Sequence, residues 1–295
     1  MGLIGGGGKN TIKGGDGADT ITGGAKADSI LGNDGDDSIT AGNGADTIEG
    51  GAGNDTINGG AGIDKVAGGA GDDEFVTLTA EQVAGDTIIG GGGTNKFVIN
   101  NGTDTAVASY DFDNIISVNT IEVSGAGAAD KNVTITFDQI TETGNQIVTV
   151  TTAQSNATSD LVITNNAASS KSRTKFNITG GGGQDTLIGS NVEDTLSGGG
   201  AADSISGGGG ADELTGGAAA NDFVFTNALT MDTITDFSGN GGNSDKIDVD
   251  YTDLNAANGM KAAQVTTIGS GTGVAIAGAG NVDTAAAAAP PIPAF

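Results

Sequence analysis

Residues 50–58 read GGAGNDTIN, residues 14–22 read GGDGADTIT and residues 59–67 read GGAGIDKVA. Written out in nines from Gly5, residues 5–76 form eight such repeats without a gap. The eighth position of every repeat is apolar. A short fixed period of this kind predicts a repeat architecture, in which each unit buries its apolar residue against its neighbours. The sixth position, here called the slot, holds Asn10, Asp19, Asp28, Asp37, Asp46, Asp55, Asp64 and Asp73.

A second array covers residues 180–224. Its slots hold Asp185, Asp194, Asp203 and Asp212, each followed two places later by Leu or Ile. The last repeat, GGAAANDFV, leaves open whether Asn221 or Asp222 fills the slot. The same nonapeptide pattern therefore governs two separate parts of the chain.

Each repeat combines a glycine-rich turn with a very short strand. Glycine permits a positive φ and lets carbonyl oxygens point inward without a side-chain clash. In the sequence Asp-Thr-Ile-Thr the aliphatic residue faces in and the threonines face out. Because nine residues bury only about one aliphatic side chain, no repeat is expected to be stable alone.

The slot residues create a charge problem. The chain carries 37 acidic and 11 basic residues, a formal charge of −26 at pH 7. Carboxylates stacked at the strand spacing of about 4.8 Å repel one another unless a cation lies between them. Oxygen ligands in a flexible loop favour calcium over magnesium and transition metals. The arrays are therefore predicted to hold several Ca²⁺ ions.

The motif GGxGxDxUx, with U a large apolar residue, stands in nearly complete form from Gly14 to Thr22 and from Gly50 to Asn58. It resembles the calcium-binding nonapeptide repeat of the RTX family. The resemblance implies an all-β fold, a parallel β-roll in two arrays with a β-rich segment between them. The resemblance also implies that carbonyl oxygens of the glycine turns bind calcium together with the slot aspartates. These are Asp19, Asp28, Asp37, Asp46, Asp55, Asp64, Asp73, Asp185, Asp194, Asp203 and Asp212.

Three positions depart from the motif. Lys26 replaces a turn glycine, and a non-glycine residue at positive φ costs about 1 kcal/mol. We expect a weaker calcium site beside Lys26, or one occupied by its ammonium group. Asn10, and Asn95 in the isolated repeat GGGGTNKFV, offer only a neutral oxygen. Calcium binding is expected to be weaker at these two array ends.

Composition excludes several functions. The chain has no histidine and no cysteine, which rules out HExxH zinc sites, thiolate sites and histidine-dependent nucleophiles. The acidic residues recur as a lattice and do not converge as a pair, so no enzyme activity is expected. The negative charge disfavours nucleic acid and anionic membranes as partners. A solvated linker would not keep an apolar residue in a constant position. An ice-binding face is disfavoured because similar ice-binding proteins place Thr in the third repeat position, which is not Thr here.

The pattern divides the chain into four segments. Residues 1–98 are expected to form the first β-roll with a capping repeat, 180–224 the second, and 225–295 a C-terminal cap with a type I secretion signal. Phe-Val pairs beginning at Phe75, Phe97 and Phe223 end the repeats, where a large side chain is expected to cover the last coil. Residues 99–179 are either an all-β insert or a degenerate continuation of the solenoid. Their stretch KNVTITF alternates with period two and places Val133, Ile135 and Phe137 on one face.

The resemblance implies an extracellular calcium-binding structural protein that folds on binding calcium after type I secretion. The first residues, MGLIGGGGKN, have neither the basic nor the apolar region of a signal peptide, and no apolar run is long enough to span a membrane. The low-charge tail is therefore expected to be the export signal read by the type I secretion machinery, or else a disordered end. We expect a surface-layer or adhesin-like module at the bacterial cell surface, with self-association or a surface polysaccharide as partner. The alternative is the C-terminal region of a larger secreted enzyme or toxin.

Overall fold

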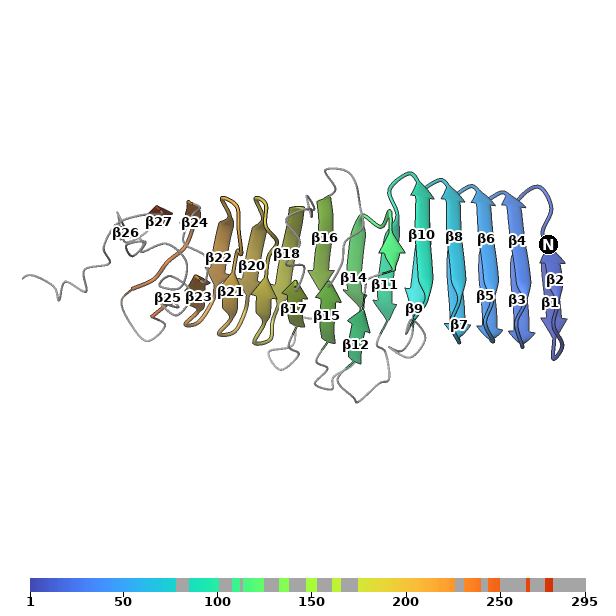
Figure 1. Ribbon diagram of the computed structural model, residues 1–295, viewed down its shortest axis with the longest axis horizontal. Helices are drawn as coiled ribbons and strands as arrows, with labels where there is room; N and C mark the ends of the chain where they lie inside the picture. Colours follow the sequence, from blue (N-terminus) through green and yellow to red (C-terminus); the bar gives the residue numbers. More distant parts are fainter. Residues whose placement is uncertain are drawn as a thin grey trace, which may run out of the picture.

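The computed structural model describes residues 1–77, 85–100, 108–111, 114–124, 133–137, 147–152, 161–165, 175–225, 231–239, 244–249, 264–265 and 274–277. Every regular element in these ranges is a β-strand, and almost all the strands pair in parallel. No helix that could span a membrane occurs in them. Figure 1 shows the strands stacked along one long axis, beginning with the N-terminal coils in blue. The predicted all-β parallel solenoid is confirmed.

Three sheets form the walls of this solenoid. The long sheet has 14 strands, and two shorter sheets of 6 and 7 strands form the opposite wall. In spatial order the long sheet contains β1 (Gly2–Gly6), β3 (Thr20–Ala25), β5 (Ser38–Asn43), β7 (Thr56–Ala61), β9 (Glu74–Thr77), β11 (Lys96–Asn100), β14 (Thr120–Ser124), β16 (Ile147–Thr152), β18 (Lys175–Gly181), β20 (Thr195–Gly199), β22 (Glu213–Gly217), β24 (Asp232–Ile234), β27 (Val274–Ala277) and β26 (Gln264–Val265).

The opposite wall changes sheets part-way along the molecule. Its N-terminal sheet contains β13 (Ile115–Ile116), β10 (Thr87–Gly92), β8 (Lys65–Ala70), β6 (Thr47–Ala52), β4 (Ser29–Asp34) and β2 (Thr11–Lys13). Its C-terminal sheet contains β12 (Ala108–Asp111), β15 (Val133–Phe137), β17 (Leu161–Asn165), β19 (Thr186–Ile188), β21 (Ser204–Ser206), β23 (Asp222–Phe225) and β25 (Lys246–Val249).

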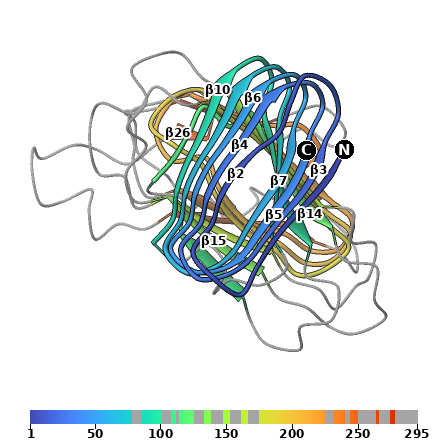
Figure 2. The ribbon, with the colours of Figure 1, turned by 90° about the vertical axis from the view of Figure 1, so that its right-hand side faces the viewer.

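Each coil of the arrays consists of two nonapeptides, one strand for each wall. Ile39 in β5 lies opposite Ile21 in β3 and Ile57 in β7, so equivalent residues stack one coil apart. Seen along the axis, the N-terminal coils superimpose as nested loops (Figure 2). The period-two pattern of the short strands places the aliphatic residue inside and its neighbours outside.

The core consists of two columns of stacked apolar side chains. One column follows the long sheet and contains Ile21, Ile39, Ile57, Phe75, Phe97, Ile121, Val150, Ile178, Leu196, Leu214 and Ile234. Burial of an aliphatic side chain of this size contributes about 1.5 to 3 kcal/mol. Because every side chain in the column packs between its neighbours in adjacent coils, stability arises only when several coils have formed.

The described strands of residues 99–179 continue the solenoid. Strand β14 pairs with β11 on one side and with β16 on the other, and β16 pairs with β18 of the second array. Of the predicted inward face, Ile135 is fully buried, and the side chains of Val133 and Phe137 lie outside the described residues. Of the two alternatives open for this segment, the described strands fit the degenerate continuation. The division at residues 98, 179 and 224 stays a prediction about folding units.

The prediction that the Phe-Val pairs cap the arrays is wrong. Phe75, Phe97 and Phe223 are fully buried inside continuous sheets. Strand β11, which carries Phe97, pairs with β9 and β14, and β23, which carries Phe223, pairs with β21 and β25. The slot ladder lengthens its step from 18 to 22 and then 24 residues around Phe97. Aromatic side chains there fill a longer coil.

The C-terminal part of the described structure departs from parallel pairing. Strand β27 pairs antiparallel with β24, and β26 pairs antiparallel with β27. The tail that the sequence assigns to secretion lies outside the described residues, apart from these two short strands.

Candidate metal sites

The slot residues lie where each glycine turn leads into the next strand, and successive slots alternate between two edges of the solenoid. Before Asp55, the turn needs a positive φ at Gly51 (128°) and Gly53 (129°). Lys26 (84°) and Asn33 (80°) stand at the same turn positions with a positive φ. The strained conformation expected for Lys26 is therefore confirmed.

A ladder of hydrogen bonds runs along each edge. The backbone N–H of Asp37 donates to Oδ1 of Asp55 at 2.9 Å, and the N–H of Asp55 donates to Oδ1 of Asp73 at 3.0 Å. The other edge repeats the pattern from Asp28 to Asp46 and Asp64. The second array has the same contacts, from Asp185 to Asp203 and from Asp194 to Asp212. One carboxylate oxygen of each slot thus holds two coils in register.

The other carboxylate oxygen, Oδ2, is buried without a hydrogen-bond partner in much of the first array. This holds for Asp28, Asp37, Asp46, Asp55, Asp64 and Asp73. A buried carboxylate oxygen without a donor is costly, so the fold leaves these oxygens in need of a positive partner.

Glycine provides the space beside each of these oxygens. A Cβ placed on Gly23 would lie 2.8 Å from Asp28 Oδ2 and 2.5 Å from the carbonyl oxygen of Ala41 in the next coil. A Cβ on Gly50 would likewise collide with Asp55 Oδ2 and the Gly68 carbonyl. Two hydrogen-bond acceptors converge on one point where no donor is present. The donor set is all oxygen, which fits a hard divalent cation.

Only one slot carboxylate lies beside each of these glycines. Within the described ranges, no group of three or more acidic side chains converges as a metal cluster. A cation in the ladder would therefore draw on carbonyl oxygens of the turns as well as on the slot carboxylates, as the glycine spacing requires.

Comparison with known protein families matches the two arrays. Residues 4–39, 22–57, 49–77, 177–196 and 188–223 match the family model described as RTX calcium-binding nonapeptide repeat (4 copies). No curated protein matches the chain. The matched segments coincide with the coils that carry the ladders. Residues 4–77 and 177–223 are RTX repeats.

Burial changes the acidity of the RTX slots. Desolvation raises the pKa of Asp55 and Asp194 to about 6, of Asp64 to about 7 and of Asp212 to about 8. Neighbouring carboxylates in the ladder add to the rise at Asp55 and Asp64. The metal-free RTX ladder therefore disfavours its own ionised form.

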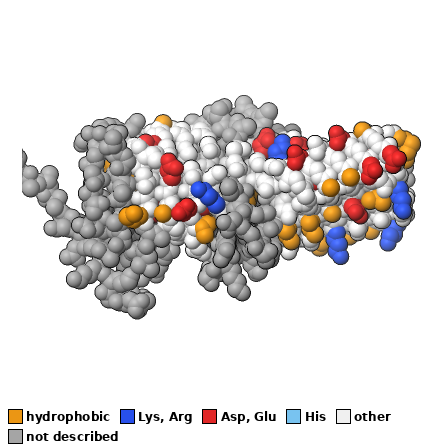
Figure 3. All heavy atoms as spheres, turned by 90° about the horizontal axis from the view of Figure 1, so that it is seen from above, with side chains coloured by type: hydrophobic (Ala, Val, Ile, Leu, Met, Phe, Trp, Pro, Cys, Tyr) orange, Lys and Arg blue, Asp and Glu red, His pale blue; other side chains and the backbone are white. Residues whose placement is uncertain are grey.

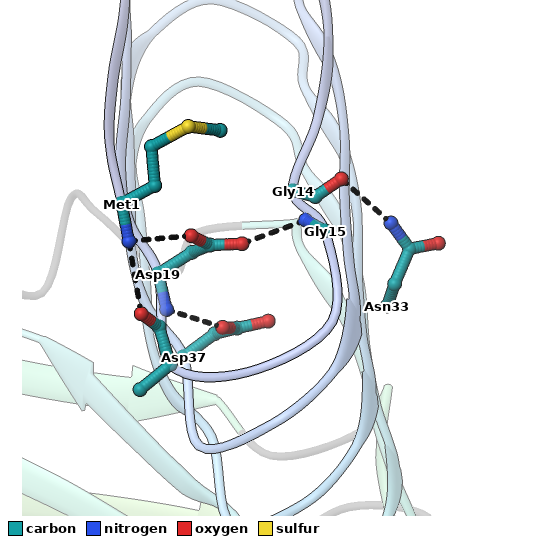
Figure 4. A network of polar contacts seen from close by, with 7 residues as sticks. Met1, Gly14, Gly15, Asp19, Asn33 and Asp37 are labelled. Carbon is teal, nitrogen blue, oxygen red and sulfur yellow. Dashed lines mark hydrogen bonds and ion pairs between the residues drawn. The ribbon is translucent and has the colours of Figure 1, made fainter.

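Two RTX slots differ from the rest. Figure 4 shows that Asp19 contacts the Met1 ammonium group through Oδ1 at 2.7 Å and the Gly15 N–H through Oδ2 at 2.7 Å. These contacts lower the pKa of Asp19. Asp194 accepts hydrogen bonds from the backbone N–H groups of Phe176 and Ser190. Both oxygens of these carboxylates have protein donors, and their ligand roles stay predictions.

The RTX ladders include residues that the repeat alignment missed. Asp86 accepts from the N–H of Asp64, and Asp232 accepts from the N–H of Asp212. Both are buried and both begin the tripeptide Asp-Thr-Ile, which also begins at Asp19. A search anchored on that tripeptide, with variable spacing, would have found them. The ambiguous last slot belongs to Asn221, because Asp222 lies outside and pairs with Lys246 at 3.2 Å.

A shorter ladder runs along the surface of the same turns. Asn54 N–H donates to Asp36, Asp72 N–H to Asn54 and Thr94 N–H to Asp72, each through side-chain Oδ1. These side chains are exposed, so the second carboxylate oxygen of Asp36 and Asp72 and the amide nitrogen of Asn54 are open to solvent. Figure 3, seen from above the strand ends, shows acidic side chains along this part of the molecule. The exposed ladder adds charge to the RTX edge without a buried oxygen in need of a cation.

Proposed function

We propose that this chain is an extracellular structural protein whose RTX arrays fold when they bind calcium after type I secretion. The RTX repeats make a calcium-binding β-roll. The observation that supports the switch is the set of buried Oδ2 atoms facing carbonyl oxygens. Without a cation these acceptors repel one another, and with one they become ligands.

Calcium concentration then decides whether the arrays are folded. Where free calcium is micromolar or lower, the formal charge of −26 and the unpaired carboxylates oppose folding. An unfolded chain can pass through a secretion channel. At the millimolar calcium of an extracellular medium, binding favours the folded state by mass action. We expect the C-terminal tail to carry the address for this export, and we expect no catalytic activity.

We assign the folded protein to a surface-layer or adhesin-like assembly. Its support is the outer face of the long sheet, where Thr20, Thr22, Ser38, Thr40 and Thr56 are exposed on three neighbouring strands. A flat, uncharged row of hydroxyl groups suits contacts with a second copy or with a surface polysaccharide. In such an assembly calcium would govern both folding and the formation of this face.

The test is a calcium titration followed by circular dichroism and light scattering, with magnesium as the control cation. A cooperative gain of β signal with calcium alone is the expected result. A simultaneous increase in particle size supports the assembly, and folding without growth favours the region of a larger secreted enzyme or toxin. A chain that is already folded in excess EDTA would refute the calcium switch.

A further inference from the structure

Asparagine holds a slot of the ladders at Asn10, Asn95 and Asn221, and again at Asn119, whose Oδ1 accepts from the N–H of Asn95. Asn10 begins one edge, Asn95 follows Asp73 on the other, and Asn221 follows Asp203 in the second array. The ladder continues from Asn221 to Asp245, but both oxygens of that carboxylate have backbone donors, so the row of unpartnered oxygens ends at Asn221. The N–H of Asp73 donates to Oδ1 of Asn95 at 2.9 Å, and the N–H of Asp203 donates to Oδ1 of Asn221 at 3.0 Å. These bonds fix which way the amides of Asn95 and Asn221 point, so their Nδ2 atoms are directed into the turn.

The amide nitrogen occupies the place that Oδ2 has in an aspartate slot. A Cβ on Gly23 would lie 2.8 Å from Asp28 Oδ2, and a Cβ on Gly5, one coil earlier, would lie 2.7 Å from Asn10 Nδ2. In both cases the carbonyl oxygen of the next coil is 2.5 Å from the same point. The position is therefore equivalent, but an acceptor has been replaced by a donor.

The donors are used. Asn10 Nδ2 donates to the Gly8 carbonyl at 2.7 Å and to Asp28 Oδ1 at 3.2 Å. Asn95 Nδ2 donates to the Ser117 carbonyl at 3.0 Å. Asn221 Nδ2 donates to Asp245 Oδ1 at 3.3 Å. In each turn an NH₂ group thus reaches an oxygen of the next coil or of its own turn. At Asn95 that oxygen is the Ser117 carbonyl, which is equivalent to the next-coil carbonyl that faces an unpartnered Oδ2 in the Asp slots.

We propose that Asn10, Asn95 and Asn221 are amide plugs, which close their turns without a metal ion and so set the ends of the calcium-binding rows. This inference rests on the proposed calcium-dependent folding. An Asp slot places two acceptors together and needs a cation, whereas an Asn slot places a donor against an acceptor and needs none. The plugged turns are therefore formed at calcium concentrations where the Asp turns are not.

The test uses reciprocal variants of the whole chain. Asn95→Asp restores a carboxylate at a plugged slot, and Asp55→Asn introduces an amide at a buried Asp slot. Asn54→Asp is the matched control, because Asn54 is exposed in a neighbouring turn position and keeps its Oδ1 contact with Asp72. Calcium stoichiometry is measured by titration calorimetry. The thermal midpoint of the metal-free chain, here called the EDTA midpoint, is measured separately in excess EDTA with enough of a stabilising osmolyte such as sucrose or TMAO to fold it.

Asn95→Asp is expected to take up about one more Ca²⁺ per chain and to lower the EDTA midpoint by about 3 °C or more. Asp55→Asn is expected to lose calcium and to raise the EDTA midpoint, because Nδ2 replaces an unpartnered oxygen. Asn54→Asp should change neither quantity. An unchanged stoichiometry and EDTA midpoint in Asn95→Asp would overturn the plug, as would a lower EDTA midpoint in Asp55→Asn.

The two proposals fail in different ways. If the unaltered chain binds no calcium, the proposed function is wrong, and the EDTA midpoints still decide whether the amides stabilise their turns. If the unaltered chain folds with calcium and all three variants behave alike in both measurements, only the plug is wrong.

Discussion

The double substitution Asp46→Ala and Asp55→Ala is expected to raise the calcium concentration needed for folding by about tenfold. The two residues lie on opposite edges and their backbone N–H groups donate to different ladders, so their effects on the free energy of folding should add. Each removes one carboxylate ligand. A site that binds only the folded state contributes about 2.7 kcal/mol when free calcium is 100 times its Kd.

The magnitude follows from the ladder. Each alanine also removes the acceptor for a backbone N–H, that of Asp28 at 2.7 Å and that of Asp37 at 2.9 Å. The loss of that acceptor is offset by removal of a buried carboxylate that has an unpartnered oxygen. The remaining loss is two sites, about 5 kcal/mol or nearly four powers of ten in the folding equilibrium. If one ion binds for each of the six carboxylates of the first array with an unpartnered Oδ2, four sites remain in the variant. The calcium midpoint then moves by about the fourth root of that factor, about tenfold.

The assay is a calcium titration of both proteins by circular dichroism at constant ionic strength. The control is Asp36→Ala with Asp72→Ala, which removes the same charge and two equivalent N–H acceptors from exposed turn positions. Its midpoint should stay close to that of the unaltered chain, because water replaces the exposed oxygens. A midpoint in the Asp46 and Asp55 variant that matches this control would refute the ladder as the calcium site.

Three further predictions follow from the same geometry. In EDTA, the β signal should increase as pH falls from about 8 toward 4. The pKa values of Asp64 (about 7) and Asp212 (about 8) are raised in the folded state, so over this range the folded state binds protons that the unfolded state releases. A circular dichroism spectrum that does not change with pH would contradict this. Lys26→Gly should stabilise its turn by about 1 kcal/mol and lower the calcium midpoint, which chemical denaturation and calcium titration would measure; an unchanged stability would show that the positive φ carries no strain. Gly50→Ala should raise the calcium midpoint severalfold, because the added Cβ collides with the carboxylate of Asp55. Gly15→Ala is the control, since a Cβ there meets nothing within 4 Å, and it should leave the midpoint unchanged. Equal midpoints for the two variants would argue against a calcium site beside Gly50.

The repeat period could be interpreted without coordinates because it is strictly local. Nine residues with glycines in the turn and one apolar residue in the strand allow few other arrangements, so Ile21, Ile39 and Ile57 were predicted to face inward and do so. The same regularity identified the slot aspartates as one stacked set. Where the period changed, as at Asp86 and Asp232, the alignment lost the slot although the Asp-Thr-Ile tripeptide persisted.

The role of the phenylalanines could not be obtained from the sequence. A large side chain at the end of a glycine array looks like a cap, but Phe97 lies between β9 and β14 in one continuous sheet. Sheet continuation depends on hydrogen bonds between strands whose sequences share no motif. Pairing of that kind is a long-range property, and no repeat pattern records it.

The β-solenoid, the apolar column and the row of carboxylates could be predicted from the repeat pattern, because each depends on spacing within nine residues. How the two oxygens of a slot are used became evident only from the stacked coils. One accepts an N–H from the preceding coil, and the other faces a carbonyl of the next, as at Asp55. The stacked coils also separated Asn221 from Asp222 and gave the asparagine slots a donor where the aspartates have an acceptor. These distinctions depend on atoms about 18 residues apart in the chain, which meet only when the coils stack.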